Sequence, residues 1–287
     1  MGILSEVMAV RTHLKCIINR IVVRRIYGAK KETLGNDYNE EIIVSLTSYP
    51  QRFNVLPDAI ISIFMQTLRP DRIILYFEDD VNYNELPPIL MELCQYGLEI
   101  EMRPHKIRPH KKYYYAMTEN TESIIITIDD DMLYSRELIR YLLNEHISHP
   151  GSVIAARAHR IKCDDNAQVL PYLKWEWESN FCHVPSDDLF ATGVGGVLYP
   201  PRCLDNKAFN IDNILKMCLN ADDIWLKVME SMVGTKVCLV DRKVWKKTYC
   251  LNKVDEGLNA INCGQNGNDA YIKNMIDEYQ CKCFCDN

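Results

Sequence analysis

Short apolar runs rich in β-branched residues recur through the first half of the chain. Each is bounded by polar or turn-forming residues, and runs of four to eight residues of this kind indicate buried strands. The four strands that this pattern predicts are residues 42–46, 72–77, 98–103 and 123–128.

The segments between these runs have the apolar spacing of helices. Pro57 stands near the start of one, and Gly97 ends another. The predicted helices are residues 56–67, 86–97 and 110–120. Strands that alternate with helices of this length predict an α/β fold, with a Rossmann-like, mostly parallel central sheet covered by helices on both faces.

The second half continues the pattern with longer loops. We expect helices at 135–150 and 221–234 and strands at 151–159 and 236–247. A glycine-rich turn at 191–201 becomes strand-like before two prolines end it. The predicted organisation is an N-terminal helix (1–31), one catalytic-type domain (42–250) and a C-terminal extension (251–287).

Charge is unevenly distributed. The net charge of −6 argues against a general nucleic-acid-binding protein, yet residues 1–31 hold seven Lys or Arg and one acid. Their apolar residues follow a helical spacing, so we expect a basic amphipathic helix that lies on an anionic membrane surface, on the domain or on a second subunit. No apolar run is long enough to span a bilayer.

The chain has 12 cysteines. Most lie inside apolar runs of a long, core-rich chain, which favours buried thiols of a reduced, cytoplasmic protein over a disulfide scaffold. The sequence CKCFC at 281–285 lacks the usual Cys-x-x-Cys pairs, so we do not expect zinc there. We interpret His146 and His149, at the end of a predicted helix, as structural.

Three consecutive aspartates follow the fourth predicted strand, in the sequence IIITIDDDM. Like charges at the end of a buried strand call for a cation. Asp129 and Asp131 point the same way in an extended segment and suit Mg²⁺ or Mn²⁺, which also take phosphate oxygens. Asp130 points elsewhere, to backbone or a ribose. Such a metal makes a diphosphate a better leaving group. The alternative, a solvated acidic turn, fits the apolar flanks less well.

Three elements in order resemble glycosyltransferase family 2 and its relatives. Residues 42–77 are similar to the opening of that family, with Gln66-Thr67 ending the first helix. IDDDM resembles the Asp-x-Asp motif of the GT-A fold, and ADDIW, which includes Asp222 and Asp223, stands where a later acidic motif is expected. The resemblance covers roughly residues 42–245.

The resemblance implies a GT-A fold, a divalent metal and a nucleotide-diphosphate sugar donor. Asp129 and Asp131 would hold the metal and the diphosphate, and Thr47, Tyr49 and Arg52 would face the nucleotide. Asp223, or Asp222, would be the general base that deprotonates an acceptor hydroxyl. A pair of acids at a helix start is also stabilised by the helix dipole, and the two roles are compatible.

Other features admit two interpretations each. Lys112 meets a phosphate or belongs to a solvated basic turn. Trp175 and Trp177 stack on an acceptor sugar or pack in the core. Some enzymes of the GT-A fold use a late histidine as a further metal ligand, and this chain has no histidine beyond His183. Processive synthases of family 2 carry the sequence Gln-x-x-Arg-Trp. This chain lacks it, so the resemblance favours transfer of a single sugar.

These observations and the resemblance together predict a metal-dependent glycosyltransferase of surface polysaccharide or glycoconjugate synthesis, with a saccharide or lipid-linked saccharide acceptor. Inversion at the anomeric carbon is implied by the resemblance alone. A nucleotidyltransferase or other phosphoryl-transfer enzyme is the alternative, although no glycine-lysine phosphate loop follows the first strand. A non-catalytic sugar- or cation-binding module is the third possibility, which leaves the second acidic pair unexplained.

Overall fold

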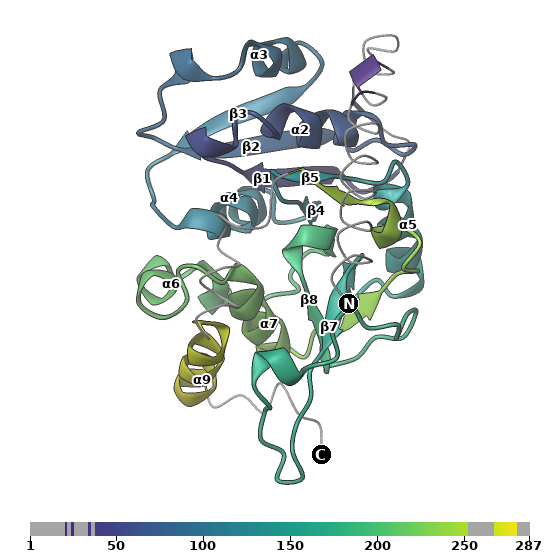
Figure 1. Cartoon of the computed structure of the whole chain (residues 1–287), viewed down its shortest axis with the longest axis vertical. Coiled ribbons are helices and arrows are strands. Elements are labelled where there is room, and N and C mark those ends of the chain that lie inside the picture. Colours follow the sequence, from purple (N-terminus) through teal and green to yellow (C-terminus); the bar gives the residue numbers. More distant parts are fainter. Residues whose placement is uncertain (1–20, 22–23, 26–33, 36–37, 252–266, 280–287) are drawn as a thin grey trace, which may run out of the picture.

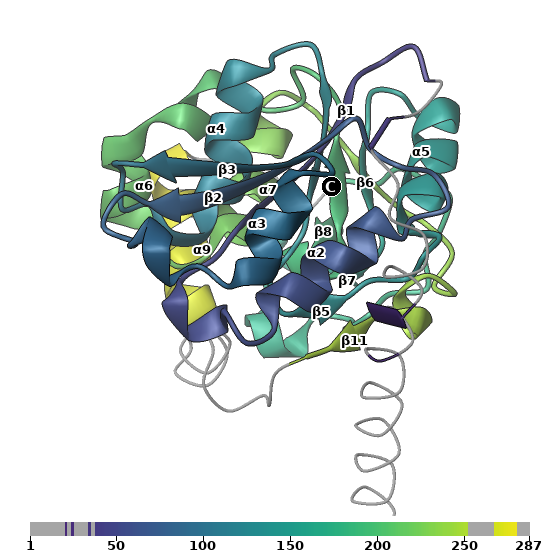
Figure 2. The same ribbon diagram turned by 90° about the horizontal axis from the view of Figure 1, so that it is seen from above.

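The computed structural model describes residues 21, 24–25, 34–35, 38–251 and 267–279. A central sheet divides the molecule into layers (Figure 1). The helices that the structure describes are α2 (Leu56–Phe64), α3 (Pro88–Cys94), α4 (Lys111–Glu119), α5 (Leu138–Ser148), α6 (Ile211–Met217), α7 (Asp222–Met232) and α9 (Gly267–Tyr279). In the view from above, α2 and α3 lie on the near side of the sheet and α7 and α9 on the far side (Figure 2).

The central sheet has seven strands in the order β10-β6-β9-β4-β1-β2-β3. Its strands are β1 (Ile42–Thr47), β2 (Arg72–Glu78), β3 (Leu98–Arg103), β4 (Ile124–Thr127), β6 (Val153–Ala155), β9 (Val197–Tyr199) and β10 (Val237–Leu239). Only β9 runs antiparallel to its neighbours β4 and β6. The expectation of a mostly parallel sheet is therefore confirmed.

Two smaller sheets flank the central one. They pair β5 (Met132–Leu133) with β11 (Tyr249–Cys250), and β7 (Ala158–Arg160) with β8 (Leu189–Ala191). The predicted strand at 151–159 is divided between β6 and β7, which belong to different sheets. The predicted strand at 236–247 ends at Leu239 and is followed by a turn and a short 3-10 helix.

Strand β1 lies between β2 and β4, and all three run parallel. Successive side chains along β1 point to opposite faces of the sheet, so both faces receive apolar residues. Ile42, Val44 and Leu46 pack in the core under α2, α3 and α5. Ile43 packs in the second core, which α4, α7 and α9 cover. Because parallel strands end at a common edge, the segments that follow β1 and β4 meet there.

Buried Gln66 joins the end of α2 to the start of α5. Its amide nitrogen donates to the carbonyls of Ser62 (3.1 Å) and Ser135 (2.8 Å), and its amide oxygen accepts from the Ile139 N–H (3.1 Å). The side chain thus satisfies backbone groups that water does not reach. This explains why glutamine follows the first helix, as the family resemblance expects.

Arg24, in the predicted N-terminal helix, forms an ion pair with buried Asp58 of α2, and its Nη2 lies 2.9 Å from Asp58 Oδ2. The basic segment therefore contacts the domain at this point. Most of residues 1–31, and the CKCFC sequence, lie outside the described residues. Within the described part of the chain, no helix combines the length and the apolar character needed to cross a bilayer.

Among the described cysteines, Cys203, Cys218 and Cys238 are buried free thiols, as expected. Cys163 is disulfide-bonded, so the expectation of reduced thiols fails for it.

Replacing Gln66 by Ala is expected to lower the free energy of unfolding by about 3 kcal/mol, because buried backbone groups of Ser135 and Ile139 lose their partner. Thr67→Ala, at an exposed neighbouring position, is the matched control and is expected to cost less than about 1 kcal/mol. Urea denaturation of the three proteins measures both. Equal stability of Q66A and T67A would contradict the role given to Gln66.

Candidate active site

The acidic segment 129–131 begins directly after β4, at the edge where β1 also ends. The Asp129 N–H donates to the Tyr134 hydroxyl (2.8 Å), and that hydroxyl donates to the Val194 carbonyl (3.3 Å). Tyr134 is buried, and its two hydrogen bonds hold the turn at Asp129 in place. The Asp129 carboxylate then points to Lys112, with Oδ1 2.8 Å from Nζ.

Lys112 is the cation at the centre of the site. It lies in the first turn of α4, is almost fully buried, and also places Nζ 2.9 Å from Asp222 Oδ2. Burial opposes its charge, but Asp129 and Asp222 raise the pKa of Lys112 well above its usual value. The alternative of a solvated basic turn is therefore excluded for Lys112. Its neighbour Lys111 pairs with Glu78 instead (2.8 Å).

Asp130 turns away from this cation. It is buried, and its Oδ2 accepts a 2.5 Å hydrogen bond from the Ser48 hydroxyl, in the loop after β1. Burial raises the pKa of Asp130 to about 7. Its carboxylate thus holds the two loops together at the strand ends.

Asp131 has a different partner, Arg52, whose Nη1 lies 3.0 Å from Asp131 Oδ2. Burial, with the charge of Asp129, raises the pKa of Asp131, although Arg52 opposes the shift. Arg52 also lies against the half-exposed ring of Tyr49 and donates to its hydroxyl (3.0 Å). Alternate aspartates are therefore held by two different cations.

The second acidic pair enters from α7. Asp222 and Asp223 occupy the first turn of this helix. Burial opposes ionisation of Asp222, but Lys112 outweighs it, and the pKa of Asp222 is lowered. Burial and the Asp222 charge raise the pKa of Asp223 to about 8. The pKa values of these two adjacent carboxyl groups are thus shifted in opposite directions, which is typical of functional sites.

The glycine-rich turn supplies space at the centre. The Gly193 N–H donates to Asp223 Oδ1 (3.1 Å). A Cβ atom on Gly193 would lie 2.7 Å from Lys112 Nζ and 3.0 Å from Asp223 Oδ1. Any larger residue at position 193 would displace the Lys112 ammonium from its ion pairs, so glycine suits this close approach.

The structure brings most of the predicted site residues together. Those that meet at this edge are Arg52, Lys112, Asp129, Asp130, Asp131, Asp222 and Asp223. Thr47 stands at the end of β1, but its hydroxyl is bonded to the Tyr76 carbonyl (2.9 Å). The sequence did not single out Ser48 or Tyr134, because nothing local marks their contacts with the aspartates.

The two tryptophans differ. Trp175 is buried in the core, and its indole N–H donates to the Leu170 carbonyl (2.9 Å), so the packing interpretation is correct for it. Trp177 is 42% exposed and lies against the ring of His159, with 4.5 Å between the ring centroids.

The carboxylate oxygens of Asp129 and Asp131 suit a divalent ion that phosphate oxygens would also coordinate. Asp129 and Asp131 belong to a site with five carboxylates and two cations, Lys112 and Arg52. In the described part of the chain these aspartates do not form a tight cluster of three ligand atoms. Mg²⁺ is commonly bound by one or two carboxylates together with substrate phosphates, and this arrangement suits Asp129 and Asp131.

Comparisons with known proteins show the class of fold. No family model and no curated protein matches the sequence. Among solved structures, the mannosyltransferase PcManGT from Pyrobaculum calidifontis, in complex with GDP-Man and Mn²⁺, matches with a TM-score of 0.54 and 10% identity, covering 92% of this chain and 72% of that one. The chain has a glycosyltransferase fold of the GT-A type, as predicted.

A more local match is glucosyl-3-phosphoglycerate synthase from Mycobacterium tuberculosis, in complex with Mn²⁺, UDP-glucose and phosphoglyceric acid. Its TM-score is 0.32 and its identity 14%, and the match covers 43% of this chain. The chain spans half the length of that structure.

Replacing Lys112 by Met is expected to lower the free energy of unfolding by about 3 kcal/mol at neutral pH, because it leaves Asp129 and Asp222 without their shared cation. Lys111→Met is the matched control. This change leaves Glu78 without its lysine partner, but Glu78 is partly exposed and can be solvated. We therefore expect it to lower the free energy of unfolding by only about 1 kcal/mol. Chemical denaturation measures both, and equal losses would contradict the central place of Lys112.

Proposed function

We propose that the protein is a metal-dependent glycosyltransferase that moves one sugar from a nucleotide-diphosphate sugar to an acceptor hydroxyl. One observation carries this proposal: Asp129 after β4 and Asp222 of α7 both pair with Lys112, and Gly193 holds Asp223 beside them. That arrangement combines groups for a metal and a diphosphate with a second carboxylate for proton transfer, within a GT-A fold.

Asp129 and Asp131 would hold the divalent ion, which neutralises the charge that develops on the leaving diphosphate. Lys112 and Arg52 now pair with these aspartates. With the ion on these carboxylates, both side chains would be able to bind phosphate oxygens, Arg52 with its planar guanidinium and Lys112, which also pairs with Asp222, as a point charge. The chain thus supplies a positive counterpart to the donor.

Asp223 is the residue we assign as general base. Its raised pKa of about 8 increases its affinity for the proton of an attacking hydroxyl, and the carboxylate form that accepts this proton predominates above that pH. The Gly193 N–H holds one of its oxygens in place. Asp222 positions Lys112 and keeps its own charge.

The end of β1 is the proposed nucleotide side of the site. Tyr49 offers an exposed ring, and Arg52 connects that ring to Asp131. Thr47 and Asp130 are proposed to contribute to nucleotide binding as well, because they hold the ends of the loop after β1. The PcManGT structure contains GDP-Man and Mn²⁺, and we extend this ligand class, Mn²⁺ or Mg²⁺ with a nucleotide sugar, to this chain as part of the proposal.

The finer parts of the proposal rest on the sequence. They are membership of glycosyltransferase family 2, inversion at the anomeric carbon, a role in surface polysaccharide or glycoconjugate synthesis, a saccharide or lipid-linked acceptor, and a cytoplasmic site of action. Nucleotidyl transfer, or another metal-dependent phosphoryl transfer, is the alternative. Nucleotidyl transfer would release pyrophosphate, whereas sugar transfer releases a nucleoside diphosphate.

The basic residues 1–31 are proposed to bring the enzyme to an anionic membrane surface. Co-sedimentation with anionic liposomes, with and without these residues, measures this. We expect the full chain to bind and the truncated chain to lose most binding at low salt. Equal binding would remove membrane contact from the proposal and leave packing on the domain, as the Arg24–Asp58 ion pair already indicates.

A donor screen tests the proposed activity. The protein with Mn²⁺ or Mg²⁺ is offered a panel of nucleotide sugars with candidate saccharide acceptors, and nucleoside diphosphate release is measured. We expect release from one donor, and Asp131→Ala to reduce it at least about 100-fold, because the metal loses a ligand. Asp80→Ala, which removes an exposed acid, is the matched control and is expected to retain activity.

Asp223→Asn separates donor binding from transfer. It keeps the size of the side chain but removes the base, so we expect unchanged metal-dependent donor binding with a loss of transfer of about 10²- to 10⁴-fold. Isothermal titration calorimetry measures the binding. Pyrophosphate as the product, or metal-dependent binding without turnover of any donor, would replace the glycosyltransferase with one of the two alternatives.

A further inference from the structure

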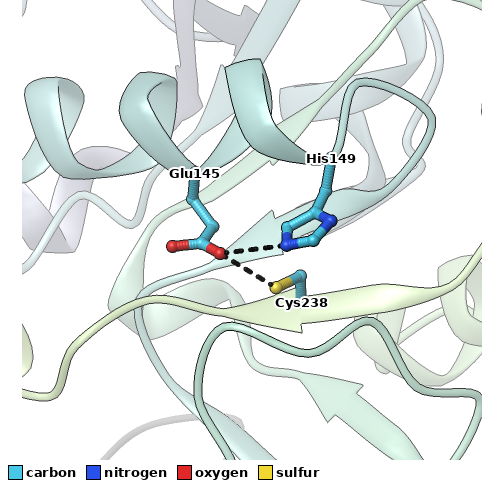
Figure 3. A group of neighbouring side chains, drawn as sticks. All are labelled: Glu145, His149 and Cys238. Carbon is cyan, nitrogen blue, oxygen red and sulfur yellow. Dashed lines mark hydrogen bonds and ion pairs between the residues drawn. The ribbon is translucent and has the colours of Figure 1, made fainter.

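A second group of ligand-type side chains lies at the β10 edge of the central sheet, and Figure 3 shows its three members. It consists of Glu145 in α5, His149 at the end of that helix, and Cys238 in edge strand β10. Cys238 pairs with Ile154, Ile154 with Leu198 and Leu198 with Ile126 of β4. Three strand spacings therefore separate this group from β4, about 14 Å along the sheet.

The ligand atoms of the three residues already lie close together. His149 Nε2 is 3.5 Å from Glu145 Oε1, and the Cys238 thiol donates to the same oxygen at 3.4 Å. All three ligand atoms lie within 4.8 Å of one another. Tetrahedral zinc with bonds of about 2.0–2.3 Å places its ligand atoms about 3.3–3.8 Å apart. Two of the three separations match that spacing without any movement.

His183 holds the carboxylate from the other side. Its Nδ1 lies 2.6 Å from Glu145 Oε2, the oxygen that faces away from His149 and Cys238. His183 adopts a left-handed backbone conformation with φ of 63°, and its N–H donates to the Leu239 carbonyl (2.8 Å), next to Cys238. Carboxylates that ligate a metal are commonly held by a hydrogen bond to a neighbouring side chain, which is the role His183 has toward Glu145.

The chemistry of the donors selects the ion. One carboxylate oxygen, one imidazole nitrogen and one thiol sulfur suit zinc, whereas Mg²⁺ and Mn²⁺ favour oxygen ligands only. Glu145 and Cys238 are buried, and His149 is partly exposed, so an ion has access from the His149 side. The group therefore differs in metal preference from the aspartates after β4.

We propose that Glu145, His149 and Cys238 bind one Zn²⁺, with water in the fourth position. Cys238 loses its thiol proton to solvent when the zinc–sulfur bond forms. His183 positions the carboxylate and is not itself a ligand. The ion joins the end of α5 to the edge strand β10 and stabilises that side of the sheet. This site is independent of the proposed sugar transfer and assigns His149 a role beyond the structural one expected from sequence.

Cobalt substitution tests the site without relying on activity. All proteins carry Cys281, Cys283 and Cys285 replaced by Ser, so that the CKCFC sequence does not contribute. After removal of metal, one equivalent of Co²⁺ is expected to produce the intense visible bands of four-coordinate cobalt and a near-ultraviolet thiolate-to-cobalt band. One equivalent of Zn²⁺ is expected to displace it and to raise the midpoint of thermal unfolding.

Cys238→Ser and His149→Gln are expected to weaken Zn²⁺ binding at least tenfold, and C238S to abolish the thiolate band. Cys203→Ser, at another buried cysteine, is the matched control and is expected to retain one equivalent. Asp131→Ala is expected to retain it as well, which separates this site from the proposed active site. Absence of stoichiometric binding to the parent protein, or binding that C238S and H149Q leave unchanged, would overturn the proposal.

Discussion

The buried ammonium of Lys112 is the interaction on which the site depends. It joins the segment after β4, through Asp129, to the start of α7, through Asp222. The Lys112 carbonyl also accepts a hydrogen bond from the Ser45 hydroxyl in β1 (2.5 Å). Lys112 thus links strands β1 and β4 to helix α7. The Gly193 backbone lies beside the Lys112 ammonium, where a side chain would displace it.

The charges explain why this edge of the sheet suits a ligand. Parallel strands leave the ends of β1 and β4 side by side, and the sequence places acids there that two cations only partly balance. Burial raises the pKa of Asp130, Asp131 and Asp223, so ionisation of this group is costly as it stands. In the proposed function, a divalent ion with a diphosphate would relieve this cost, because Asp129 and Asp131 would hold the ion while Lys112 and Arg52 gained phosphate oxygens.

Much of this was visible in the sequence, because its signals were local. Apolar runs located β1 to β4, and three aspartates after a buried strand marked the candidate site. The split of 151–159 was not predicted, since β-branched and small residues continue across the point where the chain leaves the sheet. The contacts of Ser48 with Asp130 and of Lys112 with Asp222 join residues far apart in the chain, so no periodicity reveals them.

The proposed zinc site illustrates the same limit. Glu145 and His149 are one helical turn apart and could be noticed together, but Cys238 comes from the edge of the sheet and His183 from a distant loop. Their proximity follows from the packing of α5 against β6 and β10, which only the fold determines. Two chemically different donor sets therefore lie on one sheet, one of oxygens alone and one that includes sulfur and nitrogen.

A crystal structure with Mn²⁺ and a nucleoside diphosphate would test the central claim most directly, because the anomalous signal of manganese locates the ion without assumptions. The account predicts an ion bound to Asp129 and Asp131, with the diphosphate against Lys112 and Arg52. Manganese and nucleotide located elsewhere, with Lys112 still between Asp129 and Asp222, would contradict it.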